Sequence, residues 1–180
     1  TFTAGNWNAA QTVTLTGVDD VGAIDGDKLV TIALAAATST DTNFDTLNPA
    51  DVTVTNTDGD VAGITVTPNS GLTTDESGGT ATFTVVLDAK PTADVVIPIS
   101  SGNTAEVAVS PANLTFTTGN WNVDQTVTLT GVDDAGVIDG DRLVTIALAV
   151  PSGSADTNFN VIDPADVTVT NTDGNLAGYT

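Results

Sequence analysis

The chain has 180 residues and a formal net charge of −20, from 23 acidic and 3 basic residues. This charge excludes binding to nucleic acids, whose phosphates need Lys and Arg. Cysteine and histidine are both absent, which excludes disulfides, thiol chemistry and the Ser/His/Asp and Cys/His types of catalysis. No apolar run approaches the roughly 20 residues of a membrane span. We therefore expect neither an enzyme nor a membrane span.

Residues 1–60 contain three stretches in which Val or Leu alternates with Thr, at residues 11–18, 29–34 and 51–55. A period of two is typical of a half-buried β-strand, so each stretch is predicted to be a strand. Trp7 stands in G-N-W-N before the first stretch, and Trp121 stands in the same motif later. Both are expected to cover the core between two sheets, with sugar stacking as the alternative.

From residue 64 onward the same kind of pattern predicts a longer series of strands, with residues 73–79 as a loop between the first two. The predicted strands are residues 64–67, 80–87, 95–99, 106–109, 114–116, 125–132, 143–148 and 167–170. Short strands, turns rich in Gly, Asn, Asp and Pro, and the lack of helical periodicity predict an all-β, immunoglobulin-like antiparallel β-sandwich.

A long internal repeat organises the chain. Residues 1–34 match residues 115–148 at all but six positions, and residues 49–59 match residues 164–174. The repeating unit of about 114 residues is too long for a solenoid rung, which indicates whole domains in tandem. We expect residues 1–60 to be the C-terminal half of one repeat, 61–175 a complete repeat and 176–180 the start of the next. A neighbouring copy is expected to supply the missing strands, on the same polypeptide or by strand exchange.

Each copy carries a loop dense in aspartate, at residues 17–34 and again at residues 131–148. Carboxylates gathered with a single cation, Lys28 or Arg142, repel one another, and their hard oxygens suit Ca²⁺. The alternative is an acidic surface turn, because Asp-Gly is also a hairpin turn signal. The loop residues expected to bind Ca²⁺ are Asp19, Asp20, Asp25 and Asp27 in the first copy and Asp133, Asp134, Asp139 and Asp141 in the second.

The spacing D-D, four residues, D-G-D-x-x-V-T-I-x-L resembles the Calx-beta family, a calcium-binding sandwich found in sodium–calcium exchangers, integrin β4 and many bacterial surface proteins. The resemblance covers residues 62–175 as a full domain and 1–60 as its second half. It implies further Ca²⁺ ligands in the loop after the first strand and after the last strand, which correspond to Glu76, Asp173, Asp58 and Asp60. Here the central acids are Asp139 and Asp141, where the family often has glutamate.

The leading hypothesis is a structural one: a calcium-stiffened tandem repeat of an extracellular filament or adhesin stalk on a cell surface, with bacteria as the expected source. Near-identity between copies suits a spacer whose partners are neighbouring copies of itself. The alternative is an adhesin domain that recognises a glycan or a protein through its loops. That alternative needs loops that vary between copies, and the variable loop, residues 35–40 against 149–155, is short and bland.

Overall fold

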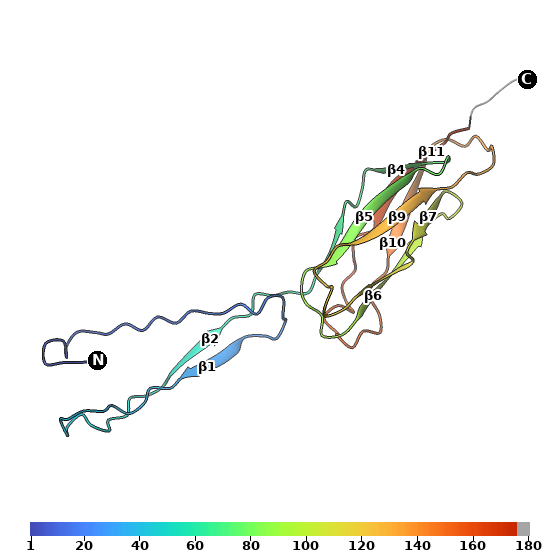
Figure 1. The fold of residues 1–180 in the computed structure, drawn as a ribbon. Coiled ribbons are helices and arrows are strands. Elements are labelled where there is room, and N and C mark those ends of the chain that lie inside the picture. The colour runs from blue at the N-terminus through green and yellow to red at the C-terminus, as the bar shows by residue number, and fades with distance from the viewer. Residues whose placement is uncertain (176–180) are drawn as a thin grey trace, which may run out of the picture. The chain divides into compact units, whose positions relative to one another are not determined.

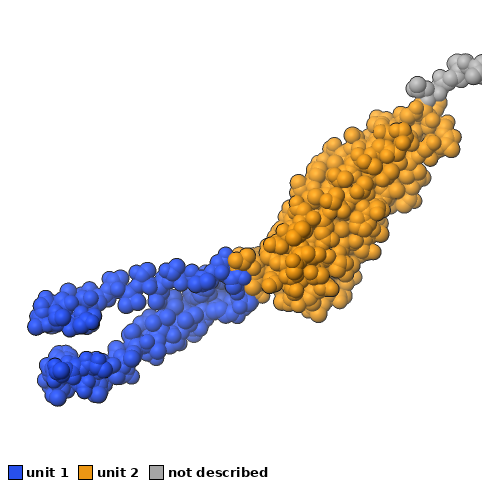
Figure 2. All heavy atoms as spheres, viewed as in Figure 1, with its two compact units in different colours: residues 1–20, 25–58 blue, residues 21–24, 59–180 orange. Residues whose placement is uncertain are grey.

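The computed structural model describes residues 1–175; the expected start of a further repeat, at residues 176–180, lies outside the described residues. The chain divides into two units, Thr1–Asp20 with Asp25–Asp58, and Val21–Ile24 with Gly59–Thr180 (Figure 2). All assigned elements of the described residues are β-strands, and none of the described residues forms a helix long and apolar enough to cross a membrane.

The second unit contains two sheets that enclose one core (Figure 1). One sheet has the strand order β4-β11-β10-β6-β8 and the other β3-β5-β9-β7. The strands are β3 (Ile64–Thr67), β4 (Leu72–Asp75), β5 (Thr80–Leu87), β6 (Val95–Ser101), β7 (Val107–Ser110), β8 (Asn113–Phe116), β9 (Gln125–Gly131), β10 (Arg142–Leu148) and β11 (Val167–Thr172). The predicted sandwich is confirmed.

Alternation of apolar and polar residues decides which side of each strand faces the core. In β9, Val127 and Leu129 are fully buried, while the threonines that alternate with them, Thr126, Thr128 and Thr130, are less buried and lie on the other face. Fully burying a side chain of this size contributes roughly 1.5–3 kcal/mol. The core draws on both sheets and on two loop residues, Ala89 and Phe159. Its members from the strands include Phe83, Val85, Leu87, Ile97, Leu114, Phe116, Val127, Leu129, Ile146, Leu148 and Val169. Trp121 packs against this core, as expected, whereas Trp7 is 72% exposed, so the prediction was wrong for Trp7.

One predicted loop is a strand. Residues 72–75 form β4, which runs parallel to β11 with Thr73 opposite Thr170 and Asp75 opposite Thr172. The remaining strand pairs of residues 1–175 are antiparallel. The prediction of a loop from residue 73 was wrong because this strand is short and its partner lies almost a hundred residues away, so local pattern does not reveal it.

The first unit contains one antiparallel pair, β1 (Lys28–Ile32) with β2 (Val52–Asn56). The strand predicted at residues 11–18 is not formed, although residues 11–17 are identical in sequence to β9. β9 forms because β5 and β7 flank it, and the first unit has no counterpart of either. Val13 is accordingly 74% exposed, whereas its equivalent Val127 is fully buried.

Candidate metal site

The acidic loops of the second unit meet at one end of the sandwich, and the strand register explains why. β4 ends at Asp75 opposite the end of β11 at Thr172, and β10 begins at Arg142 opposite Asn171. β7 begins at Val107 opposite Gly131, where β9 ends. The loops that contain Glu76, Glu106, residues 132–141 and Asp173 are therefore neighbours at this end.

Two groups of three carboxylates form there, and both contain Asp134. One group is Glu76, Asp133 and Asp134, and the other is Glu106, Asp134 and Asp139; within each group the carboxylate oxygens lie within 4.8 Å of one another. Ca²⁺ binds oxygens at 2.3–2.6 Å, so oxygens on opposite sides of one ion lie about 5 Å apart. The spacing in both groups suits an ion of this size.

Asp173 holds the loop in position from the end of β11. Its Oδ2 accepts hydrogen bonds from the backbone N–H groups of Asp139 (3.2 Å) and Gly140 (2.9 Å), and its Oδ1 accepts one from Asn175 (2.7 Å). These hydrogen bonds lower the pKa of Asp173 below its usual value and so favour its ionised form, and the bonds from Gly140 and Asn175 have the largest effects. Asp141 in turn accepts a hydrogen bond from the backbone N–H of Asp173 (3.2 Å).

The two groups of carboxylates repel one another in the absence of an ion. For Asp134, desolvation and then the charges of Asp139 and Glu106 raise its pKa. For Glu76, the hydrogen bond from Gly174 lowers the pKa, but burial and the charges of Asp134, Asp173 and Glu106 outweigh it, so that its pKa is raised. Without an ion, full ionisation of the carboxylates in these two groups is therefore unfavourable.

Arg142 is the basic residue at this end, and it satisfies one oxygen of one carboxylate. Its guanidinium donates to Oδ2 of Asp139 from Nε (2.8 Å) and from the terminal nitrogen (2.6 Å). The other oxygen of Asp139, Oδ1, is buried and has no hydrogen-bond partner among the described residues. A buried carboxylate oxygen without a partner is costly, and a cation in the group of Glu106, Asp134 and Asp139 would satisfy it.

Of the residues predicted as ligands in this copy, the structure brings Glu76, Asp133, Asp134 and Asp139 into the two groups. Asp141 and Asp173 lie in the same loops and are engaged in hydrogen bonds to the backbone. Sequence reasoning missed Glu106, which is 5% exposed and accepts a hydrogen bond from Asn171 (3.2 Å). The available signal was composition, because Glu76 and Glu106 are the chain's two glutamates among 23 acids.

The first copy repeats the loop scaffold without the glutamates. The backbone N–H groups of Asp25 and Gly26 donate to Oδ2 of Asp58 at 2.9 and 2.7 Å, and that of Asp58 donates to Asp27 at 3.0 Å. Lys28 pairs with Asp25 at 3.2 Å, as Arg142 pairs with Asp139. The aspartates thus shape the loop in both copies, whereas Glu76 and Glu106 belong to the second unit alone.

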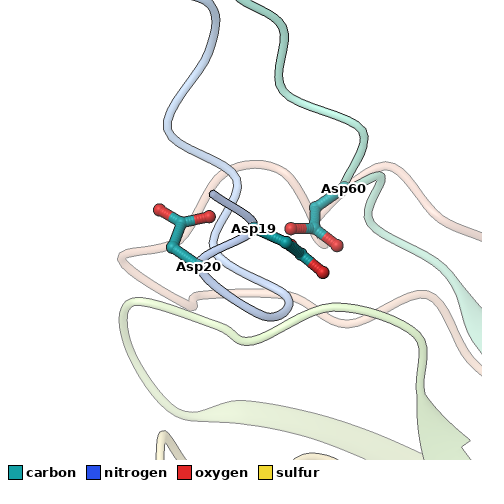
Figure 3. A group of neighbouring side chains, drawn as sticks. All are labelled: Asp19, Asp20 and Asp60. Carbon is teal, nitrogen blue, oxygen red and sulfur yellow. The ribbon is translucent and has the colours of Figure 1, made fainter. Parts of the chain in front are cut away.

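Figure 3 shows the other predicted ligands of the first copy. Asp19 and Asp20 are consecutive residues before Val21 and belong to the first unit, whereas Asp60 follows β2 and belongs to the second. Within the second unit, Oδ2 of Asp60 accepts a hydrogen bond from the backbone N–H of Gly22 (3.0 Å). Asp60 therefore helps to hold the segment Val21–Ile24 in that unit.

No family model matches the chain, and no curated protein matches it. Among solved structures it is similar to the apo form of the Calx CBD1 domain, with 21% identity over 64% of this chain and 100% of that one, and a TM-score of 0.46. It is also similar to the calcium binding domain CBD12 of CALX1.1, with 22% identity, 62% of this chain, 44% of that one and a TM-score of 0.44. A third similar structure is that of domains 1–6 of surface layer protein SbsC, with 18% identity over 86% of this chain and 21% of that one, and a TM-score of 0.38. The described residues form an all-β structure whose second unit contains two sheets around one core.

Proposed function

We propose that the second unit is a calcium-binding β-sandwich of the Calx-beta type and that the chain is a structural segment of a tandem array on a cell surface. The observation that carries the calcium assignment is the group of Glu106, Asp134 and Asp139, in which one oxygen of Asp139 is buried without a hydrogen-bond partner among residues 1–175. The adjoining group of Glu76, Asp133 and Asp134 shares Asp134, so a second ion could share that ligand.

Ca²⁺ is favoured over other cations by the chemistry of the residues. The chain has no histidine or cysteine, the ligands that Zn²⁺ and other softer metals prefer. Mg²⁺ requires a near-ideal octahedron at 2.0–2.1 Å and retains water, whereas Ca²⁺ accepts six to eight oxygens in irregular geometry. The loop of residues 132–141 with two flanking glutamates offers an irregular set of this kind.

Binding of Ca²⁺ would make the sandwich more stable, which suits a structural role. A ligand that binds the folded state alone adds about 2.7 kcal/mol when its concentration is a hundredfold above Kd. It also neutralises the repulsion that raises the pKa values of Glu76 and Asp134. The absence of histidine and cysteine supports a role without catalysis, and the array we propose is extracellular and bacterial.

The partner in this proposal is another copy of the same repeat. The first unit exposes Phe44 and Val13, whose equivalents in the second unit, Phe159 and Val127, are fully buried in the sandwich core. Strands equivalent to β5 and β7, supplied by another copy, would cover this apolar face. Sedimentation velocity over a range of concentrations tests this part, and a chain that stays monomeric at every concentration would contradict it.

The calcium assignment is tested by thermal unfolding of the full chain in Ca²⁺, in Mg²⁺ and in EDTA at constant ionic strength. We expect the Tm to rise clearly with Ca²⁺, to rise less with Mg²⁺ and to return to its starting value when EDTA is added. A Tm that is the same in Ca²⁺ and in EDTA would rule out the site. Isothermal titration calorimetry would then give the number of ions bound.

A further inference from the structure

A four-residue excursion of the chain, Val21–Ile24, is part of the second unit although the residues on both sides of it belong to the first. The carbonyl of Gly22 accepts a hydrogen bond from the backbone N–H of Lys90 (2.8 Å). Ala23 pairs with Lys90 as a parallel β-bridge, and Ile24 packs against the core of the sandwich. This segment therefore adds a short edge to the complete repeat.

Gly22 lies so close to Trp121 that any larger residue would force one of the two to shift. A Cβ atom at Gly22 would be 2.6 Å from Cη2 of Trp121 and 3.3 Å from the backbone nitrogen of Lys90. Gly22 is buried and has a φ of 78°, a conformation that also favours glycine. The surface formed by Lys90 and Trp121, which we call the receiving surface, is thus shaped for a loop with glycine at this position.

The second copy contains the same loop in the same conformation. Residues 135–138 read Ala-Gly-Val-Ile where Val21–Ile24 reads Val-Gly-Ala-Ile. The backbone φ angles are 62° at Ala135 and 85° at Gly136, against 48° at Val21 and 78° at Gly22. The loop shape is therefore a property of the repeat itself.

The surroundings of the two loops differ. A Cβ at Gly136 would meet no atom of the described part of the chain within 4 Å, whereas one at Gly22 would collide with Trp121. Val137 and Ile138 are 52% and 56% exposed, whereas the equivalent Ala23 and Ile24 are partly buried. Two adjacent apolar side chains thus stand exposed on a loop whose twin is packed against a defined surface.

We propose that residues 135–138 are a docking loop that binds the receiving surface of another copy of the repeat, as Val21–Ile24 binds the receiving surface in this chain. In the docked state Gly136 lies against Trp121 of that copy, the carbonyl of Gly136 accepts from the backbone N–H of its Lys90, and Ile138 packs against its core. The occupant is a second copy because the same chain contains both the loop and the surface that its twin fits.

This inference rests on the tandem-array part of the proposed function, and it does not require Ca²⁺. The docking loop is nevertheless connected to the acidic groups, because the carbonyl of Val137 accepts a hydrogen bond from Asn175 (3.2 Å), which also donates to Glu76 (2.8 Å). The array contact and the metal site are tested by different measurements, crosslinking for the contact and the calcium response of the Tm for the site.

The test is disulfide trapping, which is straightforward because the chain has no cysteine. The 180-residue chain is lengthened by one further copy of residues 66–175, and Val137→Cys in the original chain is combined with Lys90→Cys in the added copy. The positive control is Ala23→Cys with Lys90→Cys in the 180-residue chain. Bridged residues on neighbouring strands lie about 4.8 Å apart, inside the 4.4–6.8 Å range of Cα separations in disulfides. The negative control pairs Val161→Cys, an exposed position on another loop, with Lys90→Cys in the added copy.

We expect the Val137–Lys90 pair to crosslink to the same extent as the positive control, in Ca²⁺ and in EDTA, and the Val161 pair not to crosslink. Adding Ile138→Asp should abolish the crosslink, because it replaces the apolar side chain that packs against the neighbouring copy with a charged one. The loop itself should still fold, because Ile138 is exposed in this chain. If the positive control crosslinks and the Val137 pair crosslinks no more than the Val161 pair, the docking proposal is wrong. That result would leave the calcium assignment intact, and a Tm without calcium response would leave the docking loop intact.

Discussion

Glu106→Gln is the sharpest test of the metal site, because it removes one carboxylate from the group and leaves the shape of the side chain. Glu106 is buried and its Oε2 accepts a hydrogen bond from Asn171, which the amide oxygen of Gln can also accept. The substitution should therefore leave the fold intact. It removes a charge within 4.8 Å of the oxygens of Asp134 and Asp139, so Ca²⁺ should bind more weakly.

The size of the effect follows from the binding equilibrium. Loss of a partner in the outer shell of a metal site costs roughly 10–100-fold in affinity, and we expect at least this much for a direct ligand. If Ca²⁺ is a hundredfold above the Kd of the parent chain, a hundredfold loss reduces the stabilisation from about 2.7 to about 0.4 kcal/mol. At about 4 °C per kcal/mol for a domain of this size, the calcium-induced rise in Tm falls from roughly 10 °C to roughly 2 °C.

Scanning calorimetry in Ca²⁺ and in EDTA measures this rise for the parent chain, for Glu106→Gln and for a control, Asp124→Asn. Asp124 is exposed and precedes β9 at the opposite end of that strand from the acidic groups. An equal rise in the parent and in Glu106→Gln would refute the role of Glu106. An equal reduction in Asp124→Asn would show that net charge, and not this group, governs the response.

Two further predictions concern the core and the pH dependence. Phe159→Ala, at a fully buried position, should lower the free energy of unfolding by about 3–5 kcal/mol. Phe44→Ala, at the exposed equivalent position, should change it by less than about 0.5 kcal/mol. Urea unfolding of the monomeric chain measures both values, and equal losses would contradict the exposed position of Phe44. Because the pKa of Glu76 is raised above its usual 4.5, ionisation of Glu76 opposes folding, and this cost is absent below the usual pKa and develops as the pH rises through the raised one. In calcium-free buffer the Tm of Glu76→Gln should therefore be higher than that of the parent chain at neutral pH and the same as that of the parent in acid. A lower Tm for the variant at neutral pH would show that the neighbouring charges do not repel Glu76.

Much of the fold was predictable because alternation along a strand reports which face is buried. β5, β9, β10 and β11 all follow from Val, Leu, Ile or Phe alternating with Thr. Residues 11–18 show the limit of this reasoning, because a sequence identical to β9 does not form a strand where no neighbouring strand pairs with it. Strand formation there depends on tertiary partners, which local pattern does not contain.

The sequence pattern pointed to some members of the two groups of carboxylates and not to others. The aspartate loop contributes Asp134 and Asp139 to these groups, and their role as metal ligands stays a prediction. Aspartate serves equally as a ligand and as an acceptor for backbone N–H groups, so sequence alone did not separate Asp139 from Asp173. Glu106 was missed because its neighbours come from distant parts of the chain; for example, it accepts a hydrogen bond from Asn171, 65 positions away.

The identity of residues 11–17 with β9 also has a consequence for biosynthesis. β5 pairs with β9, which follows it in the chain, but an identical segment precedes β5 by more than sixty residues. During translation the N-terminal part of a chain emerges first, so nascent β5 meets the earlier segment before β9 has been made. Until β9 has been made, a segment identical in sequence to it is therefore available to β5 as a competing partner.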